Sequence, residues 1–463
     1  MKLAIVIMAG GKGTRLKSKR AKVLHEIGGK PLLRHVIDSA HQIVPPSDIY
    51  VVVGHQAANV EAAVKDTGVR FVQQEEQRGT GHAIQTAQRA VEEYDQLLVL
   101  SGDVPLLKPE TIAQLRDFHI EQQAAMTILT AAPQDPTGYG RVLRKKPDSP
   151  EVKAIIEQKA LTPEQQSLQE INSGIYAFEN EPLFAHIGAL KTDNAHGEYY
   201  LTDMAALLVS AGERVVAIEA ANPVEVLGAN TIAEMMELDR ELRLDTARGL
   251  MAKGVTILRP ETTVIDSTVE VGPDTIIEPF VQLLGETKIG EDCRIRSYSV
   301  IENSNLGDGV LVRVACVIGG ASIGAGSLIG PFAHIRPESD IREGAHVGNF
   351  VETKKVKLGK GSKANHLTYL GDADIGTGVN IGAGTITCNY DGVDKHRTLI
   401  GDGVFVGSNS TLVAPITVGE GSYIAAGSSI TEDVPPNALA LGRARQATKP
   451  DWAKTRRARI SKT

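Results

Sequence analysis

The first residues that could do chemistry follow a short apolar run at the N-terminus. Leu3–Met8 is typical of a buried strand, and Met8-Ala9-Gly10-Gly11-Lys12-Gly13-Thr14-Arg15 leads directly out of it. The glycines let the backbone approach a phosphate closely, and Arg15 can donate two parallel hydrogen bonds to one. Lys22 adds a cation in a stretch rich in Lys and Arg, which would suit a triphosphate. The spacing fits neither a Walker A loop nor the dinucleotide fingerprint, and a simple tight turn is the alternative.

A carboxylate that could hold a metal, Asp103, follows the apolar run Gln96–Ser101. If that run is a strand of a parallel sheet, the carboxylate falls at the strand's carboxyl end, where such sheets bind ligands. Mg²⁺ prefers oxygen ligands and is commonly held by one or two carboxylates together with substrate phosphates. Asp103 is therefore a candidate metal ligand, with a turn or helix-cap acid as the alternative.

Histidine is the side chain best suited to act as a general base near neutral pH, and the chain has twelve of them. Any single one is weak evidence, and a surface or packing role is the default for His334 and His346. Three cysteines, Cys293, Cys316 and Cys388, have no metal-ligand spacing and are odd in number. They indicate reduced thiols in a cytosolic protein.

The scaffold predicted for residues 1 to about 230 alternates short apolar runs with amphipathic stretches. This alternation predicts an α/β domain with a mainly parallel sheet and helices on both faces. Loops that follow strands then form the binding edge. The predicted strands are Leu3–Met8, Ile49–Val53, Leu97–Leu100 and Met126–Thr130, and the predicted helices are Pro31–Ile43, Gly81–Glu93 and Pro109–Gln122.

From Val271 onward an apolar residue recurs at every sixth position. This period predicts an all-β parallel β-helix, in which short strands turn corners and the coils stack around a continuous core. With three hexapeptides in a coil, residues 271–430 hold about nine coils. The period breaks at Glu352–Lys357 and at Asn389–Thr398, which we interpret as loops leaving the coil. The repeating residues are Val271, Ile277, Leu283, Ile289, Ile295 and Ile301, then Ile323, Ile329, Ile335, Ile341 and Val347, and finally Ile400, Val406, Leu412, Val418, Ile424 and Ile430.

A helix is predicted to join the two halves. Thr231 and Glu234 have capping-box spacing, and Gly254 follows the helical pattern as a stop. After Gln446, six Lys or Arg against one Asp predict a solvated basic tail. The expected division is an α/β domain at 1–230, a linker helix at 231–254, a β-helix domain at 255–446 and the tail at 447–463.

Bulk properties narrow the class of protein. A length of 463 residues predicts two or more domains, and 42% hydrophobic with 23% charged residues is typical of soluble proteins. The net charge of −7 argues against a nucleic-acid partner. The N-terminal apolar run is too short for a signal peptide or a membrane span, so we expect no membrane partner and a cytoplasmic location.

The N-terminal motifs taken together resemble the sugar-1-phosphate nucleotidyltransferases. The resemblance implies a Rossmann-like domain that joins UTP to a sugar-1-phosphate with Mg²⁺ and releases pyrophosphate. Gly10 and Ala21 stand where this family commonly has Ala and Pro, and neither change removes a functional side chain. The motifs are the glycine-rich loop, Lys22-Val23-Leu24-His25, Gln74, Gly79-Thr80-Gly81-His82-Ala83, Ser101-Gly102-Asp103-Val104-Pro105, Gly138-Tyr139-Gly140-Arg141, Glu157, Asn172-Ser173-Gly174 and Asn230.

This resemblance implies a role for each matching residue. Arg15 and Lys22 hold phosphates, and Asp103 and Asn230 bind Mg²⁺, although Asn230 could instead cap the linker helix. The amino sugar is bound by Gly140, Glu157 and Asn172. The uracil and ribose are held by Met8, Ala9, Gly10, Gly11, Gln74, Gly79 and Thr80, and Ser101 and Gly102 complete the site.

A second set of motifs is similar to the acetyltransferase domain of the bifunctional N-acetylglucosamine-1-phosphate uridyltransferase/glucosamine-1-phosphate acetyltransferase family. They are Asn365-His366-Leu367-Thr368-Tyr369-Leu370-Gly371-Asp372, Asn380, Ala383 and Cys388-Asn389-Tyr390-Asp391, with Arg336 and Glu352-Thr353-Lys354-Lys355 upstream. The resemblance covers most of the chain, with both domains in this order. It implies a left-handed β-helix, acetyl-CoA as co-substrate, and a homotrimer whose acetyl sites are shared between neighbouring chains. The expected function is the synthesis of UDP-N-acetylglucosamine, which feeds peptidoglycan and lipopolysaccharide precursors.

By this second resemblance, His366 is the base that removes a proton as the sugar amine attacks the thioester. Glu352 is a candidate partner to orient His366 or raise its pKa. The sugar phosphate is held by Arg336 and Lys354, and the sugar by Tyr369 and Asn380. The path of CoA is lined by Ala383, Asn389, Tyr390, Ser408, Ala426 and Arg443.

Three alternatives stay open. The β-helix could be a non-catalytic scaffold on a nucleotidyltransferase, although the presence of Arg336, Lys354 and His366 speaks against it. The chain could be a binding protein on a decayed enzyme fold, which the retained Lys22 and Asp103 disfavour. Cys388 could form an acyl intermediate, but no basic partner for it is visible in the sequence.

Overall fold

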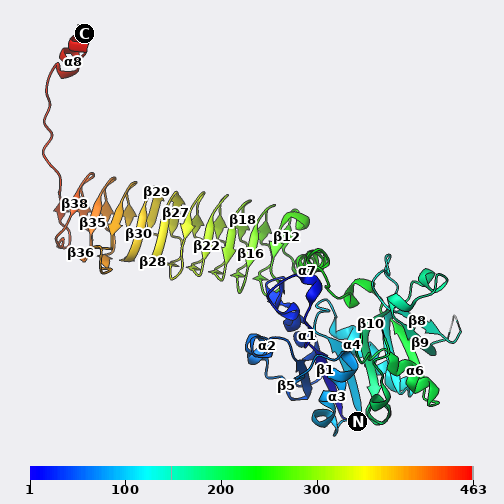
Figure 1. Cartoon of the computed structure of the whole chain (residues 1–463). Helices are drawn as coiled ribbons and strands as arrows, with labels where there is room; N and C mark the ends of the chain where they lie inside the picture. The colour runs from blue at the N-terminus through cyan, green and yellow to red at the C-terminus, as the bar shows by residue number, and fades with distance from the viewer. Residues whose placement is uncertain (147–148, 195, 461–463) are drawn as a thin grey trace. The chain divides into compact units, whose positions relative to one another are not determined.

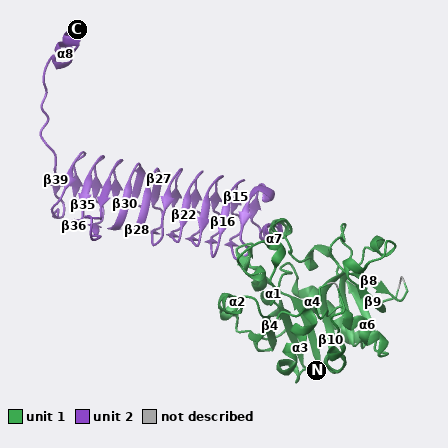
Figure 2. Cartoon of the chain, viewed as in Figure 1, with its two compact units in different colours: residues 1–242 green, residues 243–463 purple. Residues whose placement is uncertain are grey.

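The computed structural model describes residues 1–146, 149–194 and 196–460 (Figure 1). The chain forms two compact units, Met1–Leu242 and Arg243–Thr463 (Figure 2). The boundary falls inside the long helix α7 (Ile232–Ala252), so this helix contributes to both units. Within the described ranges, no helix has the length and apolarity needed to cross a membrane.

The first unit is built on a nine-stranded sheet with the central order β11-β7-β10-β6-β1-β4-β5. Strand β10 runs antiparallel to β6 and β7, whereas the neighbours of β1 are parallel to it. The sheet is therefore mixed, and the sequence analysis did not identify β10. The strands are β1 (Leu3–Met8), β4 (Ile49–Val53), β5 (Arg70–Gln73), β6 (Gln96–Ser101), β7 (Met126–Ala131), β10 (Ile171–Glu179) and β11 (Val215–Glu219), with β8 (Arg141–Arg144) and β9 (Val152–Ile156) attached to β10.

Helices cover both faces of this sheet, as predicted. Alternate residues of β1 enter different apolar clusters, with Ile5 and Ile7 in one and Ala4 and Val6 in the other. Helices α1 and α4 pack in the first cluster and α3 in the second. A sheet buried on both faces needs such near-continuous apolar strands. The helices are α1 (Leu32–Ala40), α2 (Ala57–Val64), α3 (Thr80–Val91), α4 (Pro109–Gln122), α5 (Asn180–His186) and α6 (Asp203–Ser210).

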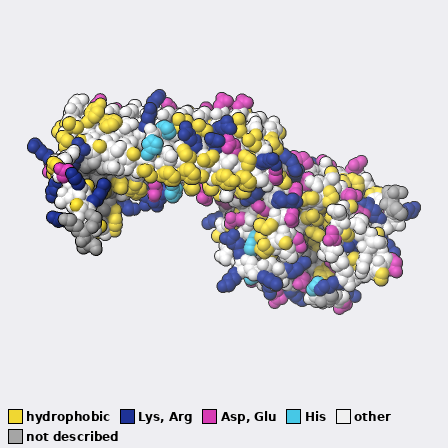
Figure 3. All heavy atoms as spheres, turned by 90° about the horizontal axis from the view of Figure 1, so that it is seen from above, with side chains coloured by type: hydrophobic (Ala, Val, Ile, Leu, Met, Phe, Trp, Pro, Cys, Tyr) yellow, Lys and Arg dark blue, Asp and Glu magenta, His cyan; other side chains and the backbone are white. Residues whose placement is uncertain are grey.

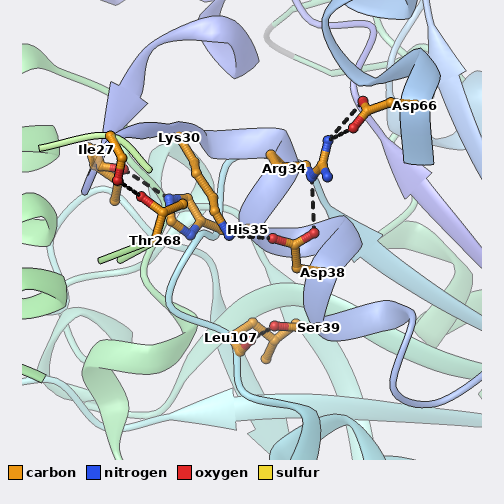
Figure 4. Close-up of polar contacts among 10 residues, drawn as sticks. Ile27, Lys30, Arg34, His35, Asp38, Ser39, Asp66, Leu107 and Thr268 are labelled. Atoms are coloured by element: carbon orange, nitrogen blue, oxygen red, sulfur yellow. Dashed lines mark hydrogen bonds and ion pairs between the residues drawn. The ribbon is translucent and has the colours of Figure 1, made fainter. Parts of the chain in front are cut away.

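Polar contacts anchor α1, the helix that packs against the Lys22 turn (Figure 4). Arg34 bridges two carboxylates, donating to Asp38 Oδ1 at 3.1 Å and to Asp66 Oδ2 at 2.7 Å. The buried ring of His35 contacts Ile27 O through Nε2 at 2.9 Å. Burial lowers the pKa of His35, so its ring is neutral near pH 7. These contacts tie α1 to Ile27 on one side and to the exposed Asp66 on the other.

The second unit is a parallel β-helix, as the hexapeptide period predicts. Its short strands form an 11-stranded and a 17-stranded sheet, and within each sheet the strands pair with strands of the coil before or after. Equivalent residues lie one coil apart, as in the pairs Ile276↔Arg294 and Arg294↔Leu311. The repeating Ile, Val and Leu side chains form one continuous core.

One of the two predicted loops is wrong. Glu352–Lys357 does not leave the coil but belongs to the continuous strand β28 (Glu352–Leu358), which pairs with β25 (His334–Ile335), β26 (Asp340–Ile341) and β30 (Tyr369–Ile375). The coil here is one residue short, because His334 pairs with Glu352 but Asp340 pairs with Lys357. The missing residue breaks the period at this corner, which lies within β28.

The other break is a loop. Lys363 pairs with Asn380, seventeen residues on, whereas Asp374 pairs with Leu399, twenty-five residues on. The extra residues form the segment Asn389–Arg397 between β32 (Ile386–Cys388) and β33 (Thr398–Ile400). Only the last predicted loop residue, Thr398, belongs to a strand instead.

Helix α7 and the tail complete the chain. Half of the predicted capping box is present, since Glu234 N–H donates to Thr231 Oγ1 at 3.2 Å. The Glu234 carboxylate accepts a hydrogen bond from Asn230 N–H at 2.8 Å rather than from Thr231 N–H. The N-terminal half of α7 buries Met235 and Leu238 in the first unit, and its C-terminal half buries Ala247 and Leu250 in the β-helix core. In the basic tail, α8 (Trp452–Ile460) is exposed along its length.

Candidate active sites

The carboxyl ends of β1 and its parallel neighbours meet at a cavity of about 500 Å³. This is the edge at which open α/β sheets bind ligands. Gly102 is held beside it, because its N–H donates to Met8 O at 3.0 Å. The cavity lining brings together most of the predicted nucleotide-site residues: Met8, Ala9, Gly10, Gly11, Arg15, Lys22, Gln74, Gly79, Thr80, Ser101, Asp103 and Asn230.

The lining also holds residues that the sequence analysis did not assign. Lys12 and Thr14 belong to the glycine-rich loop and could have been found there. Gln77 and Glu198 come from segments without a chemical motif of their own. Only the chain path brings Glu198 to this edge, so no local signal could have identified it.

The two predicted metal ligands, Asp103 and Asn230, converge on Lys22. The ammonium of Lys22 pairs with Asp103 Oδ2 and donates to Asn230 Oδ1 at 3.0 Å. The backbone ties the segments together, since Ala229 N–H donates to Asp103 O at 3.2 Å. A Cβ on Gly228 would lie 3.4 Å from Asp103 Oδ2, so a small residue keeps the carboxylate accessible.

These two oxygens suit Mg²⁺ better than a metal ion that is coordinated entirely by protein side chains. Across the described residues, no group of three or more His, Cys, Asp or Glu side chains could hold a metal. Mg²⁺ is commonly bound by one or two protein oxygens, with water and phosphate oxygens completing the octahedron. One carboxylate and one amide oxygen beside the glycine-rich loop match that requirement.

Gln74 is buried and its amide orientation is set by its neighbours. Its Nε2 donates to Gly79 O at 3.2 Å and contacts His82 Nδ1 at 3.1 Å. A Cβ on Gly10 would lie 2.8 Å from Gln74 Oε1. Glycine at position 10, where the resembling family commonly has alanine, therefore gives the Gln74 side chain room.

Gly79 precedes α3 in a conformation that favours glycine, with φ at +112°. A Cβ there would lie 2.5 Å from Tyr199 O, so Gly79→Ala combines backbone strain with a steric clash. We expect Gly79→Ala to destabilise the first unit by about 2–4 kcal/mol, measured by urea unfolding. Gly188→Ala is the matched control, because no atom lies within 4 Å of its added Cβ. Equal stability of the two variants would contradict the prediction.

The three residues predicted to bind the amino sugar lie together but outside the cavity lining. Asn172 N–H donates to Gly140 O at 2.9 Å, and a Cβ on Gly140 would lie 3.8 Å from Glu157 Cα. Burial raises the pKa of Glu157, whose Oε1 accepts a hydrogen bond from Thr202 at 3.1 Å. Ser101 connects this group to the cavity by donating to Gly174 O at 3.2 Å.

In the second unit, His366 begins a line of residues along one corner of the β-helix. It is exposed at the end of β29 (Lys363–His366), and its carbonyl accepts a hydrogen bond from Gly384 N. The next coils repeat this contact, with Asn409 N donating to Ala383 O and Gly427 N donating to Ser408 O.

This line reaches the predicted CoA-binding arginine. Arg443 Nη1 donates to Ala426 O at 2.7 Å, so the corner runs in steps of one coil from His366 through Ala383, Ser408 and Ala426 to Arg443. Adjacent coils are about 4.8 Å apart, so these four coil steps span about 19 Å. A track of backbone groups that ends in a cation suits an extended chain carrying phosphates.

The predicted phosphate-binding cations also gather, and a third one joins them. The ammonium of Lys395 lowers the pKa of the neighbouring Lys354, and Arg336 lowers it further. Lys395 lies on the loop after β32 and was not predicted as a site residue. No sequence motif marks Lys395 as a binding residue, and only the folded loop brings it to Lys354.

Glu352 does not contact His366 as predicted. Its Oε1 instead accepts a hydrogen bond from Arg336 Nη1 at 2.7 Å, and no bond between Glu352 and His366 is present in the described chain. Glu352 starts β28 and pairs in register with His334 on the coil before, which places it beside Arg336. Glu352 therefore pairs with Arg336, one of the two cations predicted to hold the sugar phosphate.

Tyr369 and Asn389 meet over Gly371. A Cβ on Gly371 would lie 2.5 Å from the Tyr369 hydroxyl and 2.9 Å from Asn389 Nδ2. Asn389 also hydrogen-bonds Asp372. Asn380 lies on the neighbouring sheet, in β31 (Asn380–Ile381), and exposed Tyr390 extends along the loop.

Comparison with known proteins agrees with both halves. Residues 5–193 match the family of MobA-like NTP transferase domains, and residues 268–303 and 397–432 match the bacterial transferase hexapeptide repeats. The fold and the two sites thus define a nucleotidyltransferase domain joined to a hexapeptide-repeat transferase domain.

Full-length relatives are more specific. The chain is 62% identical over 462 residues to the bifunctional protein GlmU of Koribacter versatilis, covering 100% of this chain and 98% of the relative. It is 52% identical to that of Solibacter usitatus with the same coverage, and 45% identical to that of Brevibacillus brevis, covering 98% and 97%. The chain belongs to the family of the bifunctional protein GlmU.

Proposed function

We propose that the chain makes UDP-N-acetylglucosamine in two steps. The β-helix unit transfers the acetyl group of acetyl-CoA to the amine of glucosamine-1-phosphate. The α/β unit then transfers the uridylyl group of UTP to N-acetylglucosamine-1-phosphate and releases pyrophosphate. The observation that carries this proposal is the full-length match to bifunctional relatives in a chain that retains both sets of side chains.

In the uridylyl step, the chain aligns two anionic substrates. Arg15 and the loop amides hold the UTP phosphates, and Lys22 neutralises charge as it develops on them. Asp103 and Asn230 would hold Mg²⁺, which supplies further neutralisation of the phosphate oxygens. The sugar phosphate oxygen attacks the α-phosphorus, the bond to the β-phosphate oxygen breaks, and pyrophosphate leaves. Alignment and charge neutralisation account for most of the catalysis in such a transfer.

In the acetyl step, His366 accepts a proton from the sugar amine as its nitrogen attacks the thioester carbonyl. The C–N bond forms, the C–S bond breaks, and CoA leaves as the thiol after protonation. Arg336, Lys354 and Lys395 hold the sugar phosphate, and the corner from Ala383 to Arg443 receives CoA. Exposure of His366 fits a base that exchanges its proton with solvent between turnovers.

A drop-out assay on the purified chain tests both activities. It combines glucosamine-1-phosphate, acetyl-CoA, UTP and Mg²⁺, and reads free thiol and pyrophosphate separately. The proposal expects thiol release without UTP, and pyrophosphate release from supplied N-acetylglucosamine-1-phosphate without acetyl-CoA. Pyrophosphate without any thiol release would leave the β-helix as a scaffold, which is the main alternative.

Metal removal separates the two sites further. With EDTA in excess over Mg²⁺, we expect pyrophosphate release to fall at least about 100-fold and thiol release to stay within about 2-fold, because only the phosphoryl chemistry needs charge neutralisation by a cation. Restoring Mg²⁺ is the control. Loss of thiol release under EDTA would contradict the assignment of the cation to Asp103 and Asn230.

We also propose that the left-handed β-helix assembles as a homotrimer. Hydrophobic side chains gather along the β-helix on the face seen in Figure 3, and large exposed apolar patches mark interaction sites. One corner carries two stacked aromatic pairs, Phe280 with Tyr298 and Phe332 with Phe350, and the exposed Leu367. Because Leu367 follows His366 directly, a neighbouring chain packed here would complete the acetyl site.

Replacing this corner tests the assembly. Phe332→Ser with Phe350→Ser is expected to shift the mass in light scattering from three chains toward one, since each phenylalanine loses about 1.5–3 kcal/mol of burial. Thiol release should fall with the mass, and uridylyl transfer should persist. A wild-type chain that is already monomeric would refute the trimer.

We further place the enzyme in the reducing cytoplasm, where its three unpaired cysteines are stable.

A further inference from the structure

The loop Asn389–Arg397 is closed by one carboxylate. Asp391 Oδ1 accepts hydrogen bonds from Val393 N–H at 2.8 Å and Asp394 N–H at 2.7 Å. Its other oxygen, Oδ2, contacts His396 Nε2 at 2.8 Å. We call the Asp391–His396 pair with these two amide contacts the loop clasp. It joins the two arms of the loop across its tip.

The arms are tied at further points that the clasp brings into register. Tyr390 and Lys395 form an antiparallel backbone bridge, and His396 N–H donates to Asn389 O at 2.8 Å. Asn389 hydrogen-bonds Asp372 at the base of one arm, and Arg397 donates to Asp374 Oδ1 at 2.8 Å at the base of the other. Hydrogen bonds therefore hold the loop in a hairpin, and Lys395 occupies a defined position on it.

That position is electrostatically unfavourable without a bound anion. Lys354 pairs in register with Gly371, and the adjacent Asp372 is hydrogen-bonded by Asn389 at the base of the loop. The bridge between Tyr390 and Lys395 therefore holds Lys395 over this part of the coil, where its charge and that of Arg336 lower the pKa of Lys354. Like charges in contact repel, and a long flexible side chain on an unrestrained loop would move away. Three cations held together offer a preformed site for a dianion such as a phosphate monoester.

We propose that the loop clasp positions Lys395 beside Lys354 and Arg336, so that Asp391 and His396 set the affinity of the acetyl site for the phosphate of its sugar substrate. The inference rests on the proposed acetyl transfer. Asp391 and His396 are positioning residues, because they act through Lys395 and do not touch the reacting atoms. Their loss releases Lys395 and removes one of three charge-assisted contacts to the phosphate.

The test measures KM and kcat of thiol release against glucosamine-1-phosphate for Asp391→Ala and His396→Ala. Each variant is expected to raise KM about 10-fold, the effect of losing one charge-assisted hydrogen bond, with kcat within about 3-fold of the wild type. The double variant should be no worse than the worse single one, since both break the same pair. Inorganic phosphate should inhibit each variant about 10-fold less strongly than the wild type.

Asp391→Asn and Asp394→Asn form a charge-matched control pair. Each removes one negative charge from the same loop, and the Asp394 carboxylate makes no hydrogen bond or ion pair among the described residues. If the loop clasp positions Lys395, KM for glucosamine-1-phosphate rises in Asp391→Asn and not in Asp394→Asn. If removal of negative charge is all that matters, both variants lower KM and the proposal is overturned.

Far-UV circular dichroism and thermal unfolding of the same samples report whether the β-helix unit of each variant folds, because uridylyl transfer belongs to the other unit. If Asp391→Ala does not fold, His396→Ala decides, because it removes a half-buried ring and keeps the two amide contacts. An unchanged KM in His396→Ala, with a fully active wild type, overturns the clasp. Absence of thiol release in the wild type instead refutes the proposed acetyl transfer. That result differs from failure of the loop clasp, in which the wild type is active and KM of the variants is unchanged.

Discussion

His366→Ala is expected to reduce thiol release from acetyl-CoA about 100- to 10,000-fold, the range that general acid–base catalysis contributes. The sugar amine must lose a proton as it attacks the thioester, and His366 stands exposed at the start of the corner that leads to Arg443. Because the base acts on the chemical step, kcat should fall far more than KM rises. Stopped assays of thiol release at saturating substrates measure the effect.

Two controls accompany this variant. Uridylyl transfer should stay within about 2-fold of the wild type, since His366 belongs to the other unit. Cys388→Ala removes the thiol at the start of the loop, which is the rival nucleophile, and is expected to retain acetyl transfer. Abolished transfer in Cys388→Ala, together with activity in His366→Ala, would exchange the roles of these two residues and favour an acyl-cysteine intermediate.

Asp103→Asn is expected to reduce pyrophosphate release about 100- to 1,000-fold. This is the range by which the loss of one electrostatic contact to a transition state slows an enzyme. The variant keeps the shape of the side chain but removes the negative charge that pairs with Lys22 and would bind Mg²⁺. Raising Mg²⁺ should restore part of the activity, because a weaker site fills at a higher concentration. Pyrophosphate release at several Mg²⁺ concentrations measures both effects.

Asp66→Asn is the matched control for this variant. Asp66 is an exposed carboxylate of the same unit that pairs with Arg34 and lies outside the cavity lining. Its loss should leave uridylyl transfer unchanged, since surface ion pairs contribute about 0–1 kcal/mol. Thiol release should be unaffected in both variants. Asp103→Asn with wild-type pyrophosphate release and unchanged Mg²⁺ dependence would remove Asp103 from the site.

The amino-acid sequence by itself determined the two architectures. Burial of every sixth side chain is a local requirement of a coil, so Ile277, Ile295 and their equivalents predict the β-helix without any knowledge of its neighbours. The apolar runs that became β1, β4, β6 and β7 are likewise local. Motifs directly after these runs, such as Asp103 after β6, could be placed at the binding edge because parallel strands share that edge.

Tertiary structure decided which distant groups meet. Three separate segments supply Lys22, Asp103 and Asn230. Their contact depends on the strand order and on the backbone hydrogen bond from Ala229 N–H to Asp103 O. Glu352 contacts Arg336 rather than His366 because it pairs in register with His334, which lies two residues before Arg336 on the preceding coil. Lys395 reaches Lys354 only through the closed loop. Periodicity reports which side chains are buried, whereas contacts between segments depend on register and loop closure, which no single stretch of sequence contains.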